Sequence, residues 1–196
     1  LNRGAHGGRG LGSSAGLNNT TGYLNTFLGS SAGVSNTTGY RNTFIGAQTG
    51  NRNTTGNYNA FLGYYSGYKN STGHSNTFFG YATGSTNTSG YRNTFIGHGA
   101  GNLNKTGREN TFVGSYAGFY SVGHGNVFLG AYAGYNETAS NRLYIDNSDT
   151  ASPLIYGQFD TDTVRVNGKF GVGINPTYSI HVAGGAYCNG STWVDA

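Results

Sequence analysis

The chain has 196 residues, of which 36 are glycine and only 9% are charged, with a formal net charge of +4. Abundant glycine and low charge are typical of disordered segments, but 11 phenylalanines, 16 tyrosines and a strict internal repeat indicate an ordered protein. The single cysteine, Cys188, excludes an internal disulfide. No apolar stretch approaches the roughly 20 residues of a membrane-spanning helix, so we expect no membrane insertion.

Charge is unevenly divided along the chain. Residues 1–136 carry eight Lys/Arg and one acid, a net charge of +7, whereas residues 137–196 carry three basic and six acidic groups, a net charge of −3. A positive shaft attracts anionic polymers and anionic cell surfaces. No recognition motif accompanies the basic residues, so nucleic acid is not an expected partner.

From Gly22 the chain repeats one unit seven times; the first six starts are seventeen residues apart and the last step is sixteen. The unit reads G-x-x-N-T-F-[hydrophobic]-G-x-x-[A/S/T]-G-x-x-N-T-T, and an incomplete copy precedes it from Gly12. A fixed short period predicts a stack of similar coils. Because the chain begins inside a degraded copy, we expect it to be linked to further sequence upstream.

Three glycines at fixed places in each unit disfavour helix, at a cost of roughly 1 kcal/mol each. The short apolar run is rich in Phe, Ile, Val and Thr, which favour strands. We therefore expect an all-β repeat solenoid, β-roll-like or β-helix-like, over residues 1–136. Each coil should contain two short strands and two turns, and neighbouring coils should lie about 4.8 Å apart.

Strand alternation places positions 4 and 6 of the unit on one face and positions 5 and 7 on the other. A small coil has one interior, so the second apolar column must be covered from outside, and we expect identical chains to form a cyclic homo-oligomer. The columns proposed for core and oligomer contacts are Asn25, Asn42, Asn59, Asn76, Asn93, Asn110 and Asn126 (position 4), Phe27, Phe44, Phe61, Phe78, Phe95, Phe112 and Phe128 (position 6), and Leu28, Ile45, Leu62, Phe79, Ile96, Val113 and Leu129 (position 7).

The asparagines allow two interpretations each. The position-4 column can form a hydrogen-bonded ladder, which we favour, or rings around an oligomer axis that hold an ion or water. The second asparagine of each unit lies in an N-x-S/T sequence, which matches a glycosylation acceptor but also suits a tight turn. We favour turn chemistry for Asn19, Asn36, Asn53, Asn70, Asn87, Asn104 and Asn136.

Aromatic residues gather in the turns of the middle and late units. They can stack between turns and stiffen the rod, or they can form a platform on which sugar rings stack. The candidate binding residues are Tyr64, Tyr65, Tyr68, Tyr81, Tyr116, Phe119, Tyr120, Tyr132 and Tyr135.

No convergent set of acids, bases and nucleophiles suggests catalysis, so we assign no catalytic residue, metal site or cofactor and do not expect an enzyme. His74 and His124 occupy position 2, where Tyr also occurs, and are interpreted as turn residues. Two pairs of turn acids, Asp146 with Asp149 and Asp160 with Asp162, fit either a loop cation or solvated carboxylates.

The repeat fails at Asn136, and residues 137–196 are predicted to form a second β module that ends the rod as a neck or cap. Strands are expected at 141–146, 153–157, 163–166, 168–174 and 178–182, and the last segment, 186–196, carries Trp193.

The N-T-F-[LIV]-G-x-x-A-G unit, over roughly residues 5–136, resembles repeats in the heads of trimeric autotransporter adhesins and in bacterial and phage tail-fibre-like proteins. This resemblance implies a parallel homotrimer of β-rolls. The adhesin unit is shorter than seventeen residues, so no side-chain role is transferred. Residues 135–138, 141–145 and 171–176 resemble the stretch before the intramolecular chaperone of endosialidase-type tail proteins. That resemblance implies a downstream chaperone that cleaves itself away, with Ala196 as the cleavage end.

The sequence thus favours an adhesive fibre segment, extracellular, on a cell surface or on a tail-like particle, that contacts a surface glycan or receptor. Two alternatives remain. One is a polysaccharide depolymerase with a site between subunits, and the other is an ice- or crystal-binding solenoid, suggested by the Thr columns at positions 5 and 16.

Overall fold

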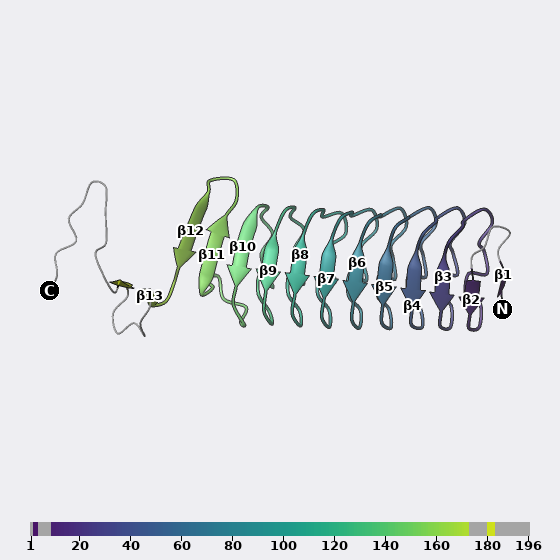
Figure 1. The fold of residues 1–196 in the computed structure, drawn as a ribbon, viewed down its shortest axis with the longest axis horizontal. Coiled ribbons are helices and arrows are strands. Elements are labelled where there is room, and N and C mark those ends of the chain that lie inside the picture. Colours follow the sequence, from purple (N-terminus) through teal and green to yellow (C-terminus); the bar gives the residue numbers. More distant parts are fainter. Residues whose placement is uncertain (1, 4–8, 173–179, 183–196) are drawn as a thin grey trace.

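The structure, a computed structural model, describes residues 2–3, 9–172 and 180–182, and the side chains of residues 10–170. This part of the chain contains strands and turns and no helix. Figure 1 shows a rod in which the strands stand side by side in chain order. The strands are β1 (Asn2–Arg3), β2 (Arg9–Leu11), β3 (Thr26–Leu28), β4 (Thr43–Ile45), β5 (Ala60–Leu62), β6 (Thr77–Phe79), β7 (Thr94–Ile96), β8 (Thr111–Val113), β9 (Val127–Leu129), β10 (Arg142–Ile145), β11 (Ile155–Gln158), β12 (Thr163–Val166), β13 (Phe170–Val172) and β14 (Ile180–Val182).

Strands β2 to β10 pair in parallel, each with the next in sequence. Equivalent repeat positions face one another, as in the pair Phe44 and Phe61. The predicted all-β solenoid with seventeen-residue coils is therefore confirmed.

Each coil contains one strand of three residues, so the expected second strand is wrong. On the opposite side of the coil, positions 10 and 12 have positive φ, as at Gln48 (60°) and Gly50 (55°). Such residues cannot continue an extended strand. That side is still bonded from coil to coil, for example by the Gly50 N–H to the Ser66 carbonyl at 2.9 Å.

The interior of the rod is a single file of phenylalanines. The position-6 rings stack along the axis with centroids 4.7–5.3 Å apart, close to the expected coil spacing. Glycine is required on either side of each ring. A Cβ on Gly46 (φ 129°) would lie 2.8 Å from the Gly63 carbonyl of the next coil, and one on Gly50 would lie 2.5 Å from the Phe44 ring.

The position-4 asparagines also lie inside the coils, and they join each coil to the next. Asn59 Oδ1 accepts the backbone N–H of Asn76 at 3.0 Å, and Asn59 Nδ2 donates to the Gly73 carbonyl at 2.8 Å. The column is 0–2% exposed. The ladder interpretation matches this geometry, whereas rings around an oligomer axis are excluded because each column is enclosed within its own chain.

The second asparagines of the first units form a ladder of their own, which runs from Asn19 to Asn70. Asn53 Nδ2 donates to Asn36 Oδ1 at 2.7 Å, and Asn70 Nδ2 donates to Asn53 Oδ1 at 2.8 Å. Asn36, Asn53, Asn70, Asn87 and Asn104 are fully buried, so the glycosylation interpretation is wrong for these five. Asn136 is exposed.

The sheet continues past the expected boundary at residue 136. Tyr144 of β10 takes the place of the next phenylalanine, with its ring 5.2 Å from that of Phe128. Strands β11 and β12 then extend the same sheet in antiparallel order. The strands expected at 141–146, 153–157 and 163–166 correspond to β10, β11 and β12. The segment 186–196, Cys188 and the proposed cleavage end at Ala196 lie outside the described residues.

Candidate functional site: an outer strand face and an aromatic edge

The outer side of strands β3 to β9 carries an exposed apolar row at position 7, which we call the strand face. Its exposed members are 36–44% accessible: Leu28, Leu62, Phe79, Ile96 and Val113. Ile45 and Leu129 are half-buried. Because the strands are in register, these side chains form a continuous ribbon one coil apart. A contiguous apolar ribbon of this kind is typical of an association surface.

The nine predicted binding aromatics form one connected cluster, the aromatic edge, on the turn that follows each strand. In the third coil Tyr64 contacts Tyr65 and Tyr65 stacks on Tyr68, both with centroids 4.5 Å apart. In the late coils Tyr116 stacks on Tyr132 at 5.3 Å, and Phe119 stacks on Tyr135 at 5.4 Å. The stacking interpretation therefore describes what these rings do in the folded chain.

Stacking also limits what the aromatic edge can bind. Two rings that stack along the rod cover the faces that they turn toward one another, so a sugar cannot stack there. Tyr64 and Tyr81, for example, stack at 5.7 Å with an angle of 21° between the rings. A face is available for a sugar ring only where a stack ends.

His98 joins the two halves of the aromatic edge, and sequence reasoning missed it. Its ring lies edge-on to Tyr81 at 5.0 Å and 4.7 Å from Tyr116, and its Nε2 is 3.3 Å from the Tyr116 hydroxyl. The signal was present, because His98 occupies the same repeat position as Tyr64 and Tyr81.

A second aromatic column, also missed, precedes the strands at positions 2 and 3. Tyr23 stacks on Tyr40 at 4.9 Å, and His74 stacks on Tyr91 at 5.0 Å with 8° between the rings. Arg41 donates to the Tyr58 hydroxyl at 2.7 Å and lies over its ring. Three of the shaft's arginines, Arg41, Arg52 and Arg92, thus lie over tyrosine rings, and along the chain each strand is flanked by an aromatic column on either side.

The threonine column at position 16 does not present the free hydroxyl array that an ice-binding surface needs. At position 16, Thr37 donates its hydroxyl to the Thr54 carbonyl at 3.0 Å, and Thr88 donates to the Lys105 carbonyl at 3.0 Å. Position 5 shares the strand face with the apolar row. The position-16 hydroxyls therefore donate their protons to backbone carbonyls of the next coil.

Acidic groups are scarce on the shaft. Within residues 10–136 the acid is Glu109, which forms an exposed ion pair with Arg92 at 3.0 Å. No three His, Cys, Asp or Glu side chains of the described residues gather where they would hold a metal ion.

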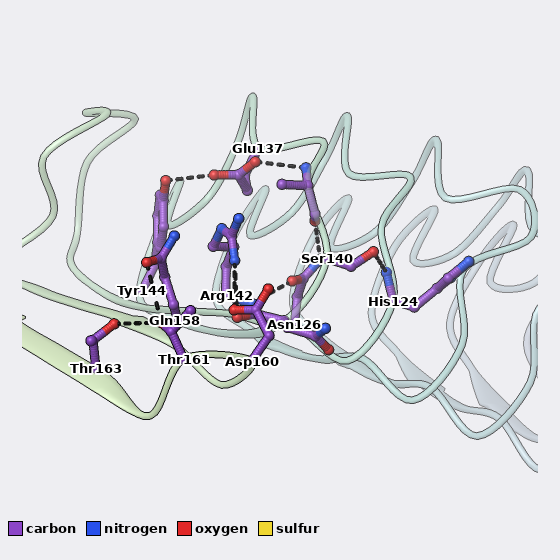
Figure 2. Close-up of polar contacts among 12 residues, drawn as sticks. His124, Asn126, Glu137, Ser140, Arg142, Tyr144, Gln158, Asp160, Thr161 and Thr163 are labelled. Atoms are coloured by element: carbon purple, nitrogen blue, oxygen red, sulfur yellow. Dashed lines mark hydrogen bonds and ion pairs between the residues drawn. The ribbon is translucent and has the colours of Figure 1, made fainter.

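At the C-terminal end of the coils, a polar cluster fixes β10 against the last full coil (Figure 2). The Tyr144 hydroxyl donates to Glu137 Oε2 at 2.6 Å, and Glu137 Oε1 accepts the Ala139 N–H at 2.7 Å. Burial, and next the hydrogen bond to Glu137, raises the pKa of Tyr144 well above its ordinary value. Asn126 Oδ1 accepts the Arg142 N–H at 2.8 Å, so the position-4 asparagine ladder ends at β10.

Comparison with protein-family models, with curated proteins and with solved structures finds no match. In the described segments, no helix is long and apolar enough to pass through a bilayer. The arguments for function therefore come from the surfaces of the rod.

Proposed function

We propose that this chain is a structural and adhesive fibre segment that works as a parallel homotrimer and presents its rod to a target surface. The observation that carries the proposal is the strand face. Leu62 (44% exposed), Phe79 (39%) and Ile96 (38%) lie on successive strands of one ribbon. Fully burying such a side chain from water is worth about 1.5–3 kcal/mol, and the fraction still exposed here contributes its share of that value, so covering the whole ribbon with sister copies is favourable.

Parallel copies suit this ribbon because its period is the same on every chain. Column-to-column contact in register places like side chains opposite one another around an axis. The strand face supports self-association, while the number three follows from the resemblance to trimeric adhesin heads and tail fibres.

The surface that remains outward suits contact with an anionic target. Arg41, Arg52 and Arg92 lie over tyrosine rings on the exposed turns. Three copies would multiply the net charge of +7 that residues 1–136 carry. Such a shaft attracts anionic surface polymers with a salt-dependent strength. We place it at a cell surface or on a tail-like particle.

Sedimentation equilibrium at micromolar concentration tests the proposal. We expect the mass of three chains for the natural sequence and of one chain for Leu62→Lys/Phe79→Lys, which puts charges into the ribbon. Thr72→Lys/Ser89→Lys adds the same charge at exposed positions outside the strand face and should keep the mass of the natural chain. A folded single chain for the natural sequence would reject the proposal.

A further inference from the structure

A pocket of about 200 Å³ opens where the aromatic edge ends. It is lined by Tyr135, Asn136 and Glu137 from the last coil, by the Tyr144 side of β10, and by 149–151 from the loop that leads to β11. The cavity exists because the chain leaves the coil path after β10, where the next strand turns back antiparallel. No further coil is laid over Tyr135, and the loop from β10 forms the opposite wall.

Tyr135 is one of the residues that line this cavity. One face of its ring is covered by Phe119 of the preceding coil, which stacks on it at 5.4 Å with 18° between the rings. Tyr116 and Tyr120 also belong to the preceding coil, and Tyr132 belongs to the same coil as Tyr135. Among the described residues, no ring from the C-terminal side contacts Tyr135. Its free face is therefore the end of a stack, where the aromatic edge offers a flat apolar surface.

Hydrogen-bonding groups surround that face. Glu137 is held by Tyr144 and by the Ala139 N–H, so its carboxylate keeps a fixed position while retaining lone pairs. In the described part of the chain, Asp149 has an exposed carboxylate with no hydrogen-bond partner. Thr150 Oγ1 accepts the Ser152 N–H at 3.0 Å and keeps its own proton for donation. The exposed Asn136 amide adds a donor and an acceptor.

An apolar ring face beside several acceptors and few donors matches the chemistry of a pyranose. The carbon face of a sugar packs on an aromatic ring, and its hydroxyls donate to carboxylates, which form the stronger hydrogen bonds. The cavity volume suits one ring rather than a chain of several. Two carboxylates disfavour uronic or sialic acids, because like charges repel.

We propose that this terminal pocket binds a single neutral or amino-bearing pyranose, with the sugar on the free face of Tyr135 and its hydroxyl groups on Glu137 and Asp149. This deepens the proposed function by naming the kind of sugar that the rod's end contacts. The pocket is complete within one chain, so it does not depend on the trimer. It also differs from the shaft, whose positive charge favours anionic polymers.

Saturation-transfer NMR with the natural chain tests the proposal. The probes are the methyl glycosides of glucose, galactose, mannose, N-acetylglucosamine and glucosamine, with methyl glucuronide as the acidic comparison. We expect at least one neutral or amino sugar to bind and the glucuronide to give no signal. Asp149→Ala, at an exposed position, and Tyr135→Leu should each weaken binding at least fivefold.

Matched variants separate this pocket from the rest of the rod. Tyr23→Leu removes an exposed ring from the second aromatic column, which does not line the pocket, and Glu109→Ala removes an exposed acid from the shaft; both should bind as the natural chain does. The proposal is overturned if none of the sugars binds, or if binding is unchanged in Asp149→Ala. It is also overturned if N-acetyl-lysine methylamide binds where the sugars do not. The single-chain variant Leu62→Lys/Phe79→Lys should retain the sugar, so failure of the pocket and failure of the trimer give different results.

Discussion

The regular coils and the terminal region from Glu137 to Val166 both bury aromatic side chains, but they provide contacts for them in different ways. In the coils, the buried phenylalanine rings meet their equivalents one coil away, as Phe61 meets Phe78 at 4.7 Å. In the terminal region the repeat ends, so side chains have no equivalent one coil further along, and single pairs such as Tyr144 with Glu137 form instead. The comparison teaches that a periodic sequence repeats one set of buried contacts, so side-chain arrangements that occur once in the chain arise where the period stops.

The largest expected difference between the two regions concerns a buried ring. Phe78→Ala leaves a gap in the phenylalanine file between Phe61 and Phe95, and we expect a loss of about 3–5 kcal/mol in the free energy of unfolding. Phe159, 49% exposed beyond β11, provides the matched change in the terminal region. Phe159→Ala should cost less than about 1 kcal/mol by chemical denaturation. Similar losses for the two variants would contradict the single-file core.

The position-4 asparagine ladder gives the next comparison between the coils and the terminal region. Asn59→Ala leaves the Asn76 N–H unpaired in a buried site, which costs about 1–3 kcal/mol, and removes one of the two side-chain donors to the Gly73 carbonyl, which keeps Asn70 Nδ2. Asn126→Ala frees the Arg142 N–H and the Ala139 carbonyl, which are only partly buried. We expect the loss for Asn126→Ala to be the smaller, because water reaches those groups. Urea unfolding of both variants checks the order, and the reverse order would count against the ladder.

Alkaline pH should reduce the contribution that Tyr144 makes to the stability of the terminal region. Its folded pKa is raised above the ordinary value of 10.0, so the folded state holds the phenol proton more tightly than the unfolded state. That contribution to stability is fully present below pH 10 and is lost as the pH rises above it. We expect Tyr144→Phe to melt at a lower temperature at pH 8, and the gap to the natural chain to narrow by pH 11. A gap that stays constant would show that the phenol proton contributes nothing.

The smallest expected effect tests the backbone of the coils. Ala82 has a φ of 50° at the repeat position where Gly99 stands one coil later. Since a side chain costs roughly 1–2 kcal/mol in this conformation, Ala82→Gly should leave stability unchanged or raise it by up to about 1 kcal/mol. Ala100→Gly removes a fully buried methyl and should lower stability by about 1 kcal/mol. Thermal melts compare the two, and equal losses would contradict the backbone assignment.

The repeat made the coils predictable, because period, alternation and glycine placement all indicate the same structure. Asn25 and Phe27 were assigned to one face and Leu28 to the other, and they lie so. The second strand was not predictable from the pattern, because the positive φ of residues such as Gln48 and Tyr65 carries no sequence signature. The terminal pocket was missed for a different reason. It joins Tyr135 to Asp149, and their proximity depends on where the loop after β10 returns.

The central claim is that the strand face is covered by the same face of sister chains in register. Ile96→Cys in a Cys188→Ser background tests it directly, with Thr106→Cys as an exposed control in the same coil. Mild oxidation should join chains covalently through residue 96 and leave the residue 106 variant uncrosslinked on a non-reducing gel, because a disulfide forms only between closely placed cysteines. Folded chains that stay separate in the Ile96→Cys variant, or that crosslink equally well at residue 106, would contradict the account.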